Sequence, residues 1–171
     1  LSAQGFDRDG SIRVDVLPGI TAAQVAASRL GAPLMNWFAF NALCDDITDP
    51  DAIDRRLNAC AEGDIVTVVY KLRYNAEEHP EHYPIEKFPR FHPPVQRSQE
   101  RFEKMCGFFL KTRAPETPVV IARNLGDEDE SLKTIALSDL KDHFAEVNLT
   151  SILLIGNSET RVEGGWLVSN R

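Results

Sequence analysis

A stretch near the start of the chain combines a tight turn with a helix whose first amides could bind an anion. Residues 16–24 read Val-Leu-Pro-Gly-Ile-Thr-Ala-Ala-Gln, and an alanine-rich segment follows. The first N–H groups of a helix have no partner within it, so this terminus, with the Thr21 hydroxyl beside it, suits a carboxylate or another acceptor. Thr is also a common helix cap, and the motif alone favours this simpler structural role.

Two further segments end an apolar strand in a turn that could meet a ligand. Residues 117–126 run from Val-Val-Ile-Ala into Arg-Asn-Leu-Gly, and Glu130 and Thr134 follow. Residues 150–160 run from Ile-Leu-Leu-Ile into Gly-Asn-Ser. Ligands of α/β sheets usually bind at the carboxyl ends of strands, where main-chain groups are exposed. Each segment is a weak signal by itself, because strands that end in Gly-Asn are common.

Hydrophobic periodicity and turn residues predict the elements that position these segments. We expect helices over 22–30, 50–61 and 96–111, and strands over 12–17, 37–40, 65–70, 119–122, 132–137, 152–155 and 166–168. Thr21 and Asp49 are the expected caps of the first two helices, with Pro50 in the first turn of the second. Helices and strands alternate early and strands follow one another late, which predicts the α/β class: a mixed β-sheet flanked by helices.

The apolar positions of the expected strands predict a single core. Its expected members are Val14, Val16, Ile65, Val68, Val120, Ile121, Ile152 and Leu154.

The segment 73–95 interrupts this pattern. It is rich in proline and contains three of the chain's four histidines, and a long loop inside a compact domain is usually functional or mobile. The run His79–His82, with His92 nearby, could suggest a metal site, but a proline-containing run in such a loop is poorly preorganised for one. We therefore expect a solvated loop and no bound metal.

Four basic residues lie in or beside the same segment: Arg73, Lys87, Arg90 and Arg97. They could pair with the carboxylates of an acidic ligand. They fit equally well a loop of balanced charge.

Composition limits the remaining classes of function. The chain has 171 residues, which favours one domain, and a net charge of −7, which argues against nucleic-acid and membrane-surface partners. Its longest apolar runs have the length of strands, so no membrane span is expected, and no signal peptide is recognisable. Cys44, Cys60 and Cys106 form no CxxC pair and are expected to be reduced structural thiols. We expect a cytoplasmic domain cut from a longer protein.

The three segments together, in this order and spacing, resemble the tetrapyrrole methylases. The stretches GITAA, RLGAPLM, TPVVIARN and IGNSET are most similar to the precorrin-3B C17-methyltransferase branch of that family. The resemblance covers nearly the whole chain apart from residues 1–11 and the 73–95 loop. It implies methyl transfer from S-adenosylmethionine to a ring carbon of a precorrin in cobalamin biosynthesis, by a fold of two α/β domains with the cofactor in the cleft between them.

The resemblance also implies where the cofactor would be held. The contact residues are Thr21, Ala22, Tyr70, Lys71, Asn124, Leu125 and Gly126. The first two would meet the amino-acid end of the cofactor, the next two would lie along its middle, and the last three would present main-chain groups to the adenine. No catalytic residue is implied, because the sulfonium is already an activated methyl donor and the enzyme mainly positions the reactants.

This sequence departs from the family pattern in several places. The Gly-x-Gly-Pro-Gly and Gly-Gly-Asp-Pro loops of the family's N-terminal domain do not occur, so we expect 1–11 to be a lead-in from a missing N-terminal domain and 12–171 to be the C-terminal domain. Asn36 stands where the branch usually has His. Residues 70–75 read Tyr-Lys-Leu-Arg-Tyr-Asn where the branch has Tyr-Asn-Pro-x-Ser, so Lys71 either replaces a polar contact or blocks the pocket.

Two interpretations follow from the resemblance and these departures. In the first, the chain is the cofactor-binding half of a precorrin methyltransferase, inactive alone and homodimeric like its family, with C11 and C20 methylation still open beside C17. In the second, it is a non-catalytic methylase-like module for dimerisation or for binding a tetrapyrrole or a partner protein.

Overall fold

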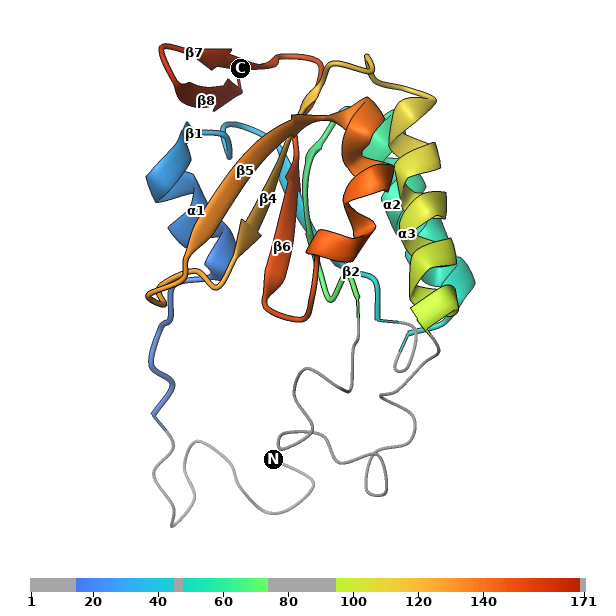
Figure 1. The fold of residues 1–171 in the computed structure, drawn as a ribbon, viewed down its shortest axis with the longest axis horizontal. Coiled ribbons are helices and arrows are strands. Elements are labelled where there is room, and N and C mark those ends of the chain that lie inside the picture. Colours follow the sequence, from blue (N-terminus) through green and yellow to red (C-terminus); the bar gives the residue numbers. More distant parts are fainter. Residues whose placement is uncertain (1–14, 45–47, 74–94, 170–171) are drawn as a thin grey trace.

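A five-stranded mixed sheet forms the centre of the fold (Figure 1). The computed structural model describes residues 15–44, 48–73 and 95–169. The strands are β2 (Phe38–Ala42), β3 (Val66–Tyr70), β4 (Pro118–Arg123), β5 (Ser131–Ala136) and β6 (Ser151–Ile155), in the order β2-β3-β6-β4-β5. Within the described part of this sheet, only β2 and β3 are parallel neighbours; β6 runs antiparallel to both β3 and β4. The strands β2, β3 and β4 therefore all end at the same edge of the sheet.

A smaller three-stranded sheet lies at the top of Figure 1. The hairpin of β7 (Thr160–Glu163) and β8 (Trp166–Ser169) pairs with the two-residue β1 (Gly31–Ala32). This pairing joins the end of the first helix to the last strand of the chain.

Helices cover both faces of the main sheet, with α1 on one side and α2 and α3 on the other (Figure 1). The helices are α1 (Ala22–Leu30), α2 (Pro50–Glu62) and α3 (Val95–Leu110), and η3 (Leu137–Glu146) is a 3-10 helix that packs beside α3. The cap predictions are confirmed, because Thr21 accepts a hydrogen bond from the Gln24 N–H and Asp49 accepts one from the Ala52 N–H. The expected fold class is confirmed as well.

The prediction of a single core is wrong, because the sheet is buried on both faces. Val68, Val120, Ile152 and Leu154 pack in a cluster on the α1 side. Ile121 belongs to a larger cluster on the α2–α3 side, and Ile65 packs against that cluster. Successive side chains of a strand point to opposite faces, so a strand buried on both sides divides its apolar residues between two cores.

The expected strand at 12–17 is also wrong in its described part. Residues 15–17 have no strand structure, and Val16 is 89% exposed. Val14 lies outside the described residues. An alternating pattern indicates a strand only where a neighbouring strand is available to pair with it, and here the segment leads directly to Pro18 and Gly19. The other expected helices and strands occur within one or two residues of their predicted bounds, whereas β1, β7 and η3 were not predicted.

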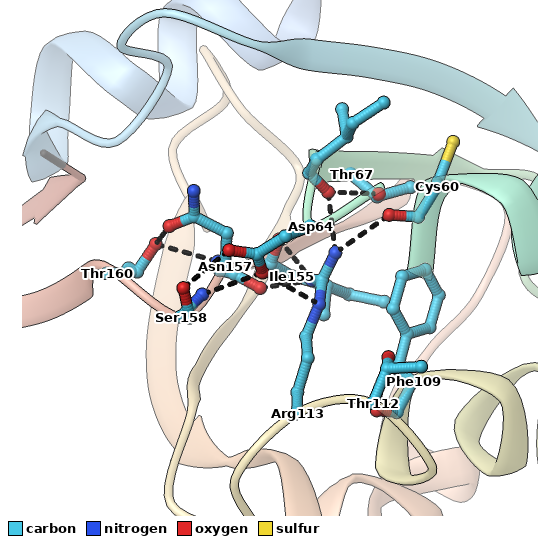
Figure 2. Close-up of polar contacts among 12 residues, drawn as sticks. Cys60, Asp64, Thr67, Phe109, Thr112, Arg113, Ile155, Asn157, Ser158 and Thr160 are labelled. Atoms are coloured by element: carbon cyan, nitrogen blue, oxygen red, sulfur yellow. Dashed lines mark hydrogen bonds and ion pairs between the residues drawn. The ribbon is translucent and has the colours of Figure 1, made fainter. Parts of the chain in front are cut away.

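A buried arginine holds together the edge of the sheet where β3 and β4 begin (Figure 2). The Arg113 guanidinium donates to the carbonyls of Cys60, at 3.2 Å, Ile65, at 2.7 Å, and Gly156. It lies 4.6 Å from the ring centroid of Phe109. Burial lowers the pKa of Arg113 to about 10, which still leaves the side chain charged at neutral pH.

The Gly-Asn-Ser turn of residues 156–158 belongs to this arginine-centred edge. Because β6 is antiparallel to β3 and β4, its end lies where they begin, at the opposite edge from Tyr70. A Cβ on Gly156 would be 2.6 Å from the Thr160 Cβ and 2.8 Å from the Pro118 oxygen, so only glycine fits there. The third of the segments singled out above thus has a structural role.

We predict that Arg113→Met lowers the free energy of unfolding by ~3 kcal/mol or more, because buried carbonyl groups lose their donor. Chemical denaturation measures the change. Arg161→Met is the matched control: Arg161 pairs with Glu163 at the surface, where an ion pair contributes ~1 kcal/mol at most. Equal losses in the two variants would contradict the structural role of Arg113.

Candidate functional site

The edge where β3 and β4 end brings together most of the residues expected to hold the cofactor. Tyr70 is the last residue of β3, and Asn124 follows directly after β4. The N-terminus of α1 reaches the same edge, where the Ala23 N–H donates to the Tyr70 hydroxyl oxygen at 3.3 Å. In Figure 1 this is the lower edge, to which the arrow of β4 points.

A shared apolar support fixes these segments relative to one another. Ala22, Tyr70 and Leu125 are all partly buried, and all pack against the cluster on the α1 side of the sheet. Ala22 comes from the first turn of α1, Tyr70 from the end of β3, and Leu125 from the turn after β4. The three segments meet although they are far apart in the sequence.

Thr21 caps the N-terminus of α1, which is the structural role that the sequence favours. Its hydroxyl accepts from the Gln24 N–H at 3.3 Å, and the Gln24 side-chain oxygen accepts from the Thr21 N–H at 3.3 Å, which forms a capping box. Thr21 is exposed, so its hydroxyl also faces solvent at the edge of the site. Contact of Thr21 and Ala22 with a cofactor stays a prediction.

Hydrogen bonds also fix the conformation of the turn at Asn124, Leu125 and Gly126. Asn124 has a φ of 49°, its side-chain oxygen accepts from the Thr150 hydroxyl, and its side-chain nitrogen donates to Asp129 at 2.6 Å. Its carbonyl accepts from the Asp127 N–H at 3.0 Å. The positive φ is tolerated because Asn is among the residues that adopt it most readily.

Glu130 holds the remaining end of this turn, a role that the sequence did not reveal. One carboxylate oxygen accepts from the Gly126 N–H at 2.7 Å, and the other accepts from the Arg29 Nε at 3.1 Å. The Gly126 N–H, followed by Arg29, lowers the pKa of Glu130 below its ordinary value. A ligand that uses the Gly126 N–H must therefore displace this carboxylate.

Lys71 points to a different neighbour from the other expected contact residues. It directly follows β3 with a φ of 54°, and its Nζ lies 3.8 Å from the Sγ of Cys44. Its side chain thus reaches toward the segment after β2. Phe40 of β2, which sequence reasoning passed over, has its ring centroid 6.1 Å from that of Tyr70.

The other candidate sites gain no support from the described residues. No group of three or more His, Cys, Asp or Glu among them could hold a metal ion, and His79–His82, Lys87, Arg90 and His92 lie outside them. Arg73 donates to the Ala145 carbonyl at 3.0 Å, so this hydrogen bond is a contact within the fold. Within the described ranges, no helix has the length and apolar character needed to cross a membrane.

Comparison with known proteins identifies the family. Residues 5–141 match the Tetrapyrrole (Corrin/Porphyrin) Methylases. The chain belongs to this family. The expected resemblance is thus confirmed, and the converging residues lie on a tetrapyrrole methylase fold.

Relatives of this methylase domain are named for cobalamin biosynthesis. The cobalamin biosynthesis protein CobIJ of Mycobacterium tuberculosis is 32% identical over 88% of this chain and 26% of its own length. A probable cobalt-factor III C(17)-methyltransferase of Salmonella typhimurium is 28% identical over 94% of this chain and 57% of its own length. The chain therefore spans only part of the length of the curated relatives it matches.

Solved structures of methylases share the fold. The methyltransferase CobJ superposes with a TM-score of 0.72 at 24% identity, over 94% of this chain and 57% of that one. The uroporphyrin-III C-methyl transferase of Thermus thermophilus, in complex with S-adenosylhomocysteine, gives a TM-score of 0.51 at 18% identity, over 85% of this chain and 53% of that one.

We predict that Glu130→Ala accelerates hydrogen exchange at the Gly126 amide, because the N–H loses its acceptor. Glu128→Ala is the control, since Glu128 is an exposed acidic residue of the same loop. NMR detects both changes. The protection that the Glu130 carboxylate gives to the Gly126 amide should be complete above the ordinary Glu pKa of 4.5. It should be lost as pH falls through the lower pKa that Glu130 has in the folded chain. Exchange that is equal in both variants would contradict the role of Glu130.

Proposed function

We propose that this chain binds S-adenosylmethionine at the carboxyl edge of β3 and β4, as part of a precorrin C17-methyltransferase of cobalamin biosynthesis. One observation carries the proposal: the N-terminus of α1, Tyr70 and the Asn124–Gly126 turn converge on this edge, with the Ala23 N–H bonded to the Tyr70 hydroxyl. Family membership and the names of the relatives support the reaction class.

The residues at this edge suit the three parts of the cofactor. At the start of α1, the Thr21 hydroxyl and the Ala22 N–H would meet the amino-acid carboxylate, since the Ala23 and Gln24 N–H groups are already bonded to Tyr70 and Thr21. Tyr70 and Lys71 would lie along the middle of the cofactor, which requires the Lys71 side chain to turn away from Cys44. The main chain of residues 124–126 would meet the adenine. The cofactor supplies the activated methyl group, so this chain's residues bind and orient it and keep water away from the reaction.

In this proposal a second domain completes the site by covering the other side of the cofactor. Thr21 and Gly126 are exposed, and Tyr70 and Leu125 are only partly buried, so the described residues cover one side of a ligand. A second methylase domain, the N-terminal domain of the family, would cover the other side and form the trough for the tetrapyrrole. In this arrangement residues 1–11 are the lead-in and 12–171 the C-terminal domain, with its long loop at 73–95.

The same proposal places the protein in the cytoplasm as a homodimer, with a precorrin as its substrate and with no nucleic-acid or membrane partner. The chain alone is expected to methylate no precorrin, because in-line positioning of two reactants needs both walls of the cleft.

We predict that S-adenosylhomocysteine binds the chain alone with a Kd near millimolar, because loss of ~4 kcal/mol of contacts weakens a micromolar site about a thousandfold. Calorimetric titration measures this affinity. Thr21→Val should weaken binding about fivefold by removing a hydroxyl donor, and Thr21→Ser should restore it.

Asp49→Ala is the control, since it removes the cap of α2 at a similar cost in stability, ~1 kcal/mol, without touching the proposed site. An equal loss of affinity in Asp49→Ala and Thr21→Val would contradict a direct role for Thr21. Micromolar binding by the chain alone would contradict the need for a second wall. No binding at any accessible concentration would contradict the proposed cofactor site and favour a non-catalytic module.

A further inference from the structure

The loop between β4 and β5 folds back on itself and brings a carboxylate against its own main chain. It covers residues 124–130, and two successive turns shape it. The Asp127 N–H donates to the Asn124 carbonyl at 3.0 Å, and the Glu130 N–H donates to the Asp127 carbonyl at 3.2 Å. The Glu130 carboxylate thereby accepts from the Gly126 N–H at 2.7 Å. This end of the candidate cofactor site therefore holds a side-chain acceptor next to a main-chain donor.

The main chain at Gly126 can be approached closely from outside the fold. Gly126 is exposed and has a φ of 92°. Among the residues that the structure describes, a Cβ on Gly126 would meet no atom within 4 Å beyond its chain neighbours. Glycine permits both this backbone conformation and the close approach of a ligand to the main chain. A flat ring can therefore reach the Gly126 N–H once the carboxylate moves aside.

Arg29 holds the same carboxylate by its other oxygen. The Arg29 Nε donates to Oε1 of Glu130 at 3.1 Å, whereas the Gly126 N–H donates to Oε2. The Gly126 N–H, followed by Arg29, lowers the pKa of Glu130, so at neutral pH the carboxylate is ionised and can only accept hydrogen bonds. A ligand that takes the Gly126 N–H would leave the carboxylate bound to Arg29, with Oε2 free to accept from another donor.

We propose that Glu130 selects adenine at this end of the site, by accepting a hydrogen bond from the 6-amino group while the Gly126 N–H donates to the ring nitrogen N1. The inference rests on the proposed function, in which the main chain of residues 124–126 meets the adenine, and it adds a side chain to that contact. The hydrogen bonds balance. The carboxylate exchanges the Gly126 N–H for the amino group, and the N–H exchanges the carboxylate for N1, so neither group is left without a partner.

The same two groups disfavour a purine with an oxygen at position 6. Hypoxanthine carries a hydrogen on N1 and an acceptor oxygen at position 6. In the placement of adenine, its N1–H would face the Gly126 N–H and its oxygen would face the Glu130 carboxylate. The ribose and the amino-acid end of the cofactor determine which way the ring lies, so the ring cannot turn over to exchange these groups. A site built to pair specific polar groups discriminates because mismatched groups lose their partners.

NMR titration with S-adenosylhomocysteine and S-inosylhomocysteine tests the proposal, because the two ligands differ only at positions 1 and 6 of the purine. For the wild-type chain, the dissociation constant of the inosyl ligand should be about tenfold or more above that of the adenosyl ligand, a difference of about 1.4 kcal/mol. Glu130→Ala should reduce this ratio to about twofold, since water can satisfy the remaining mismatch at the exposed Gly126 amide. Glu128→Ala is the matched control: it removes the same charge from an exposed position of the same loop and should keep the wild-type ratio.

Glu130→Gln tests the same role with a side chain of unchanged length. Its amide can donate as well as accept, so it can pair with the 6-oxygen of hypoxanthine, and the ratio of the two dissociation constants should again fall to about twofold. This variant covers the case in which Glu130→Ala alters the turn.

The ratio of the two dissociation constants separates selection of adenine from a structural role. If Glu130 only orders the turn, its variants weaken both ligands equally and the ratio stays at the wild-type value, which would overturn the proposal. A wild-type ratio near one would overturn it as well. In both cases S-adenosylhomocysteine still binds, so the proposed cofactor site stands. A wild-type chain that binds neither ligand would overturn the cofactor site and the selection of adenine together.

Discussion

The buried Arg113 guanidinium is the contact on which the alignment of the sheet depends. It binds carbonyl oxygens at the end of α2, just before β3 and just after β6, and so fixes three segments at one edge. A cation in an apolar interior is costly unless its donors are satisfied, so these segments are held together by the need to satisfy it. Because the edge of the sheet where β3 and β4 begin is fixed, the positions at which these two strands end are fixed too.

The candidate site is a consequence of this alignment. Because β6 lies between β3 and β4 and is antiparallel to both, Tyr70 and Asn124 come to the same edge, and α1 packs across the sheet with its N-terminus beside Tyr70. The two edges therefore differ: one surrounds a buried charge, and the other presents the exposed Thr21 and the turn at Asn124–Gly126. Ligand-binding edges of α/β sheets show the same division.

The sequence predicted what local signals encode and missed what distant residues decide. Thr21 and Asp49 were correctly assigned as caps because a cap and its partner lie within one turn of helix. The carbonyl groups that Arg113 binds lie 43 to 53 positions away in the sequence, and Glu130 meets Arg29 across 101 positions, so neither could be predicted from spacing. The strand expected at Val16 failed for the same reason, because a pattern shows one strand but not its neighbour.

Chemical-shift mapping with S-adenosylhomocysteine tests directly whether the carboxyl edge of β3 and β4 binds the cofactor. At millimolar ligand, we expect shifts at Thr21–Ala23, Tyr70 and Asn124–Gly126. We expect unchanged signals at Gly156–Thr160, on the edge closed by Arg113. Shifts centred on Gly156–Thr160, or saturable binding that leaves Tyr70 and Gly126 unchanged, would contradict it.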